Sequence, residues 1–225
     1  MKLDLRRPAL VVAGSWNPQV FTPQWLVRNL FEVPEGENVE IGVLQEFDVP
    51  NRTQKDTIFF KEIGFYSTTS RFEVTRNNGA KKTAELAENV ALRTISSLPH
   101  TPLNGFGCNL RFFETDPDDA IVDKIKTRDK IDELYTITSR SFKSTIDIRR
   151  NVELNLTVTR NQELVTFDFN YHHSGITSEN ASELIVGSIT KYLDHAVKLL
   201  KEVYGIEGYD LQLQEFAPQQ PGDDE

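Results

Sequence analysis

The sequence has few of the residues that mark secreted, membrane-spanning or metal-binding proteins. Its 225 residues include one cysteine, one methionine and two tryptophans. Cys108 alone cannot form a disulfide within the chain or build a cysteine metal cluster. No apolar run approaches the roughly 20 residues that span a bilayer, and the apolar stretch near the N-terminus is interrupted by Gly14, Ser15 and Asn17. We therefore expect a cytoplasmic protein that makes no membrane contact.

Positive charge is also scarce. The chain has 25 Lys and Arg residues against 34 Asp and Glu residues, a formal charge of -9 and a pI near 5.1. This is the wrong sign for a protein whose whole surface attracts nucleic acid or anionic lipid. The densest basic stretch contains Arg140, Lys143, Arg149, Arg150 and Arg160. We take Arg149 and Arg150 as candidate contacts to an acidic partner and expect no nucleic-acid partner, since only one aromatic residue is interleaved there.

The remaining composition is that of an ordinary folded protein. The chain is 38% hydrophobic and 26% charged, so it can build a core without disulfides or a structural metal. Short segments rich in β-branched and aromatic residues precede a helical pattern in the first half and are followed by another strand. In chain order the expected strands are Val39–Leu44, Thr57–Tyr66 and Arg71–Thr75, the helix runs from Lys81 to Ser97, and the next strand is Gly105–Phe113.

The second half repeats this order. Asp116 and Pro117 are typical of a helix start and predict a short connecting helix to about residue 130. Residues 134–148 alternate as a strand does, and residues 152–158 and 165–171 form the clearest hairpin pattern in the chain. The longest helix follows, from Ser178 to a stop at Gly205.

These patterns predict an α+β fold of meandering antiparallel sheets, each packed by an amphipathic helix. We expect an N-terminal half at residues 1–115, a C-terminal half at 116–216 and a disordered acidic tail at 217–225. The tetrapeptide Val-Thr-Arg-Asn occurs at residues 74–77 and again at 158–161. A duplicated βββα-type unit is one interpretation, and chance recurrence of four common residues is the other.

The N-terminal segment is the most individual part of the sequence. A buried strand is followed by the turn residues Ser15, Trp16 and Asn17 and by a helix start before Trp25. Packing of the aromatic side chains on the sheet is the ordinary interpretation. A second is that Ser15, Trp16, Asn17 and Trp25 contact a partner, because tryptophan is enriched at interfaces. A third is nucleotide binding, which Gly14 alone supports poorly.

No set of residues meets the requirements of a catalytic or metal site, and we predict no cofactor. His172 and His173 are neighbours in a strand and point to opposite faces. Asp168 and His172 share a face but lie roughly 13 Å apart along the strand. A hydrolase or nuclease would therefore need Asp and His residues that folding brings together, which one sequence cannot reveal.

The leading hypothesis is a non-enzymatic subunit that acts through protein–protein contacts, in a homo-oligomer or a multiprotein complex. Strand-rich meanders leave free edges, and the polar alternating segment from Thr136 to Ile148 is suited to pairing with the edge of a second chain. An accessory subunit of a microbial defence or toxin-type system would fit this description. The alternatives are a hydrolase or nuclease and a small-molecule or nucleotide-sensing domain.

Overall fold

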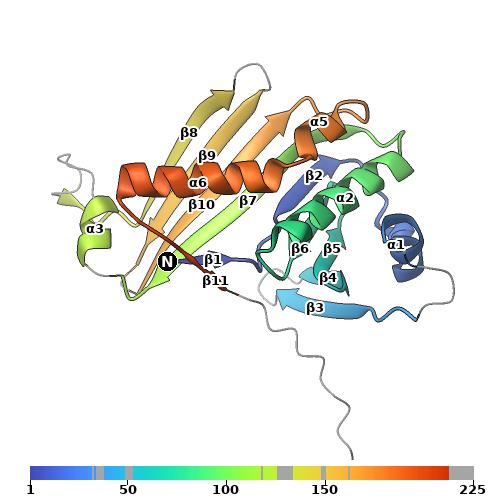
Figure 1. Ribbon diagram of the computed structural model, residues 1–225, viewed down its shortest axis with the longest axis horizontal. Coiled ribbons are helices and arrows are strands. Elements are labelled where there is room, and N and C mark those ends of the chain that lie inside the picture. Colours follow the sequence, from blue (N-terminus) through green and yellow to red (C-terminus); the bar gives the residue numbers. More distant parts are fainter. Residues whose placement is uncertain are drawn as a thin grey trace, which may run out of the picture.

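Strands dominate the computed structural model, which describes residues 1–31, 33, 38–48, 53–117, 119–125, 134–147, 151–161 and 163–212. The eleven strands of these ranges form one sheet with the main order β3-β4-β5-β6-β2-β7-β10-β9-β8 (Figure 1). Outside this order, β1 pairs with β7, and β11 pairs with β1. Helices α2 and α6 lie over one face of this sheet. We call this the helix face and the opposite one the open face. No helix of the described ranges is long and apolar enough to cross a membrane.

The first half of the chain supplies six strands and three helices. Its elements are β1 (Lys2–Asp4), β2 (Leu10–Gly14), the 3-10 helix η1 (Pro18–Val20), α1 (Pro23–Leu30), β3 (Gly42–Asp48), β4 (Thr53–Phe60), β5 (Ile63–Ser67), β6 (Arg71–Arg76) and α2 (Lys81–Ser97). The meander from β3 to β6 returns to pair with β2. The expected strand Thr57–Tyr66 is in fact two strands, because the chain reverses at Lys61, which has a φ of 51°. The sequence offers no glycine or proline at this turn.

The second half repeats the arrangement. Its elements are β7 (Leu103–Thr115), α3 (Asp119–Ile125), β8 (Ser139–Asp147), β9 (Val152–Arg160), β10 (Leu164–Ser174), α5 (Ala181–Ile185), α6 (Ser188–Tyr204) and β11 (Asp210–Gln212). The expected helix from Ser178 is divided, because Gly187 adopts a φ of 74° between α5 and α6. The expected connecting helix is present as α3 from Asp119 to Ile125, and its predicted continuation lies outside the described residues. Asp116, the predicted start, instead has a φ of 50°, and its amide donates to the Glu163 carbonyl.

The two halves meet where β2 pairs with β7 in the middle of the sheet. In each half the first strand pairs with the last strand of its meander, β2 with β6 and β7 with β10. The α+β class and the two meanders with their helices are thus confirmed, and both meanders belong to one sheet. The repeated tetrapeptide lies at the ends of β6 and β9, which hold different places in the two halves, so it does not mark the repeat.

The hydrophobic core lies between the helix face and the helices. Alternate residues of the central strands point into it and are fully buried, as the hairpin pattern predicts; examples are Phe106, Cys108, Phe167 and Phe169. The residues between them reach the open face, where most side chains are polar and half-buried. One continuous sheet runs through both halves, and the division at residues 115 and 116 stays a prediction about domains.

Candidate interaction surface

Strands β3 and β8 occupy the two ends of the main strand order (Figure 1). Among the described residues each of them pairs with one neighbour only, as does the short strand β11. Large apolar side chains are exposed on both: Val43 and Phe47 on β3, Phe142 and Ile146 on β8. The edge strand β8 falls within the segment from Thr136 to Ile148 that the sequence singles out for edge pairing. Free edges with exposed apolar residues are templates for pairing with another chain.

The backbone of β8 presents its unpaired groups at alternate residues. In an antiparallel ladder, opposite residues alternate between bonded and non-bonded pairs. The amide of Arg160 donates to the carbonyl of Thr138 at 2.8 Å, so this is a bonded pair. The register of β8 and β9 then makes Phe142 and Leu156 a bonded pair as well. The N–H and C=O groups that point away from β9 belong to Ser139, Ser141, Lys143 and Thr145; we call these groups the β8 edge.

Side-chain contacts with β9 hold this edge strand in place on the open face. Lys143 pairs with Glu153 at 2.9 Å, and the hydroxyls of Ser141 and Thr157 lie 3.0 Å apart. Phe142 projects to the helix face, where 48% of its surface remains exposed. These contacts order the strand without a partner chain. Within the described part of the chain, its outward backbone groups have no partner, and the exposed Phe142 ring lies beside them on the helix face.

Strand β3 differs from β8 in charge. It carries Glu46 and Asp48 and no basic residue, whereas β8 carries Arg140, Lys143 and Asp147. In an acidic protein, β8 is thus a local region of positive charge. This charge is partly compensated within the chain by Glu153.

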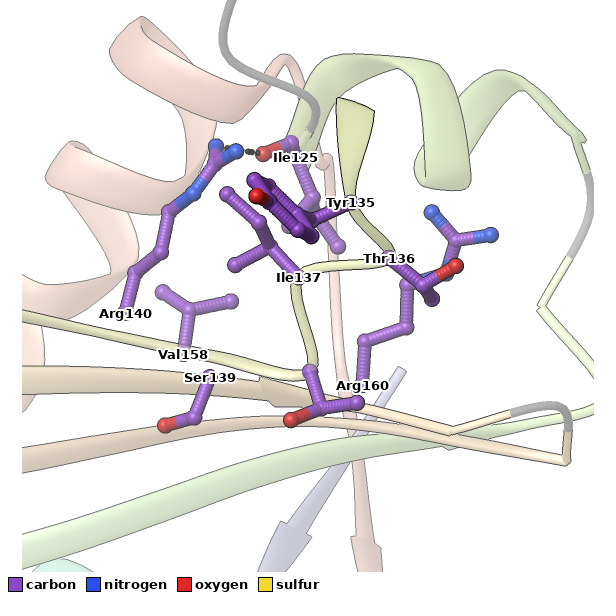
Figure 2. Close-up of a pocket in the computed structure, with 9 residues that line it drawn as sticks. Ile125, Tyr135, Thr136, Ile137, Ser139, Arg140, Val158 and Arg160 are labelled. Atoms are coloured by element: carbon purple, nitrogen blue, oxygen red, sulfur yellow. Dashed lines mark hydrogen bonds between the residues drawn. The ribbon is translucent and has the colours of Figure 1, made fainter. Parts of the chain in front are cut away.

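A cavity of about 200 Å³ lies where β8 begins, beside α3 (Figure 2). Tyr135, Ile137 and Val158 supply its apolar wall, and Figure 2 shows Arg140 and Arg160 on opposite sides of these residues. The Arg140 Nη1 atom donates to the carbonyl of Ile125 at 2.6 Å, which ties β8 to α3. The residues lining it offer no carboxylate or histidine that could act as an acid or base.

The open face carries a hydrogen-bonded polar ladder across the central strands. Arg111 binds Asp168 through both carboxylate oxygens, the second at 2.9 Å. Asn170 donates to Asn109 at 2.5 Å and accepts from Asn155 at 3.2 Å. These side chains bond one another across three strands. The Asp168 carboxylate is thus engaged by arginine, not by a histidine.

Two of the histidines bond tyrosines beneath α6. His173 is buried and its Nε2 lies 2.7 Å from the Tyr192 hydroxyl, while His195 Nδ1 lies 2.9 Å from the Tyr171 hydroxyl. Burial lowers the pKa of His195, and Lys198 and Lys191 lower it further. Burial raises the pKa of Tyr171. Each of these histidines bonds a tyrosine hydroxyl, and we interpret both pairs as packing contacts at the core.

His172 lies on the open face, opposite to His173, as the sequence predicts. Its ring covers Gly105 so closely that a Cβ atom there would be 2.9 Å from the ring carbon Cε1.

Burial raises the pKa of the Cys108 thiol to about 12, which keeps it protonated and unreactive. The described residues contain no group of three or more His, Cys, Asp or Glu residues that could hold a metal ion.

The structure separates the residues predicted to contact a partner. Trp16 is buried, with its ring 4.8 Å from that of Phe72 and its Nε1 donating to the Val12 carbonyl. Trp25 is half-buried against Phe21, while Ser15 and Asn17 are exposed. Packing accounts for Trp16, and a partner contact at Ser15, Asn17 or Trp25 stays a prediction. Arg149 and Arg150 lie outside the described residues.

Sequence reasoning identified the segment of the β8 edge but not its outward residues. Alternation shows which side chains share a face. It does not show which backbone groups lack a partner, because that depends on which strand pairs with β8. The hydrogen bond from the Arg160 amide to the Thr138 carbonyl, just before β8, shows which residues of β8 bond β9 and which point away from it.

Comparison with protein-family models and with curated proteins finds no match to this chain.

Proposed function

We propose that this protein is a non-enzymatic assembly subunit that joins another protein chain through the β8 edge. The observation that carries the proposal is an ordered edge strand with unpaired backbone groups at alternate residues and an exposed phenylalanine. Strand addition to such an edge gives affinity through main-chain hydrogen bonds and specificity through the side chains between them. An acidic chain with one buried cysteine is suited to the cytoplasm, where we place this subunit.

Proline at position 141 tests this function directly. The Ser141 N–H points away from β9, so Ser141→Pro removes a donor that only a partner strand would use. Ser141→Ala is the matched control, because it loses the same hydroxyl contact with Thr157 and keeps the N–H. Tagged wild-type, Ser141→Ala and Ser141→Pro chains are purified from the source cells. The amount of each protein that co-purifies with the tagged chain is then measured, including untagged copies of the same chain.

We expect a chain bound in stoichiometric amount to the wild type and to Ser141→Ala and lost from Ser141→Pro. Equal retention by all three would contradict the proposal, and so would the absence of any bound chain. Circular dichroism of the purified variants checks that each is folded.

A further inference from the structure

We infer that the chain that pairs with the β8 edge is a second copy of this protein, joined antiparallel about a two-fold axis that passes beside Phe142. This inference rests on the proposed function and names its partner. Two-fold dimers are the commonest oligomers, and their interfaces must be self-complementary. A dimer of this kind requires that β8 can pair with a second copy of itself.

The backbone of β8 is compatible with self-pairing. Its bulge lies between Thr145 and Asp147, so the regular part of the strand runs from Ser139 to Thr145. Phe142 is the midpoint of that part. A two-fold axis there pairs all of its outward groups: Ser141 bonds Lys143 of the second copy, and Ser139 bonds Thr145 of the second copy. Any other two-fold register leaves more of these groups without a partner.

The side chains favour the same register. Phe142 lies opposite Phe142 of the second copy in a non-bonded pair, where side chains approach most closely. This would cover an aromatic ring that is 48% exposed in the single chain. Both copies would keep their helices on the same side of one continuous sheet, because Phe142 is on the helix face in each.

Charge separates this register from one of the two adjacent ones. Moving the axis from Phe142 to Lys143 would place Lys143 directly opposite its own copy, and like charges directly opposite each other destabilise a sheet. In the register centred on Phe142, Lys143 lies opposite Ser141 and keeps its ion pair with Glu153. The other free strand, β3, is less suited to self-pairing, because it carries Glu46 and Asp48 and no basic residue, so two copies would bring four carboxylates into one contact.

Pairing of β8 with β3 of a second copy is the main competitor. That contact joins two different surfaces, so each added copy leaves a free edge for the next and assembly does not stop at two. The two arrangements therefore differ in mass as well as in register. A short edge contact buries little surface, so we expect dissociation in the micromolar range.

Engineered cysteines test the register in the purified full chain. Phe142→Cys would place two thiols in a directly opposite pair, within disulfide reach. Ser144→Cys is the matched control on the same face and edge, where the two thiols would be roughly 13 Å apart along the strands. The native Cys108 is buried and should not react. Molar mass is measured by light scattering from about 1 to about 100 μM for the wild type and Ser141→Pro.

We expect a disulfide-linked dimer from Phe142→Cys under mild oxidation and none from Ser144→Cys. We also expect the wild type to reach twice its 25.7 kDa chain mass and Ser141→Pro to remain at the chain mass. A wild type that stays monomeric overturns the inference, as does a dimer that Ser141→Pro retains or a species that grows beyond a dimer. If the wild type is monomeric but binds a different protein that Ser141→Pro loses, the proposed function stands and only the identity of the partner is wrong.

Discussion

At the scale of single residues, Glu88 connects the two halves of the molecule. This buried carboxylate of α2 accepts N–H bonds from Gly187 at 2.8 Å and from Ile189 at 2.9 Å, at the start of α6. The first N–H groups of a helix need such acceptors, and α6 has no side-chain cap of its own. Burial raises the pKa of Glu88, against the lowering effect of these two bonds.

Glu88→Ala should lower the free energy of unfolding by about 2–3 kcal/mol, because two buried N–H groups lose their acceptor. Glu88→Gln should cost less, about 1–2 kcal/mol, since one amide oxygen remains. Urea denaturation measures both. Equal stability of the alanine variant and the wild type would show that water replaces the carboxylate at this helix end.

His195 should make the stability of the protein depend on pH. Its pKa is lowered in the folded chain by burial and by Lys198 and Lys191, so the unfolded chain takes up a proton first as pH falls. The contribution of His195 to the free energy of unfolding is therefore fully present above about pH 6.5 and declines as the pH falls below that value. His195→Gln should show a smaller decline between pH 7 and pH 5 in urea denaturation. Parallel curves for the two proteins would argue against this origin.

At the scale of elements, an edge strand has one paired side and one free side. Phe142 uses its N–H in the ladder with β9, whereas Ser141 does not. Phe142→Pro should therefore lower the free energy of unfolding by about 1–3 kcal/mol, while Ser141→Pro should change it by less than about 1 kcal/mol. Denaturation at low protein concentration, where the chain is monomeric, makes this comparison. The opposite ranking would mean that the outward residues have been misassigned.

The elements that could be predicted are those whose pattern is local. The predicted β9–β10 hairpin is present, and the alternate residues of both strands face the core as expected, because alternation determines which side chains share a face. Helix α2 has the predicted bounds. The turn at Lys61 was missed because its backbone conformation is one that glycine or asparagine usually adopts.

Contacts between distant elements could not be predicted. The bonds from Glu88 to the start of α6, and those of His173 and His195 to tyrosines, join residues whose separation in sequence gives no signal of proximity. The sequence indicates only that a meander leaves some strand at an edge, and it does not identify that strand as β8. The residues of β8 that point outward can be assigned only from its observed register with β9.

At the scale of the whole molecule, one sheet crosses from the first half to the second through β2 and β7. Strand β1 also pairs with β7 and β11, and the bonds of Glu88 add a connection on the helix face. We therefore expect the halves to unfold together. Both tryptophans, Trp16 and Trp25, lie in the first half, so their fluorescence reports on that half while far-UV circular dichroism reports on both. The two urea transitions should coincide, and separate midpoints would show independent halves.

Amide hydrogen exchange along β8, followed by NMR at low and high protein concentration, tests directly whether this edge joins two copies of the chain. We expect the N–H groups of Ser141 and Lys143 to exchange rapidly in the dilute protein and to become protected as concentration rises. The N–H groups of Phe142 and Ser144 should be protected throughout, because they bond β9. Rapid exchange of Ser141 and Lys143 at every concentration would contradict the claim that this edge joins two copies.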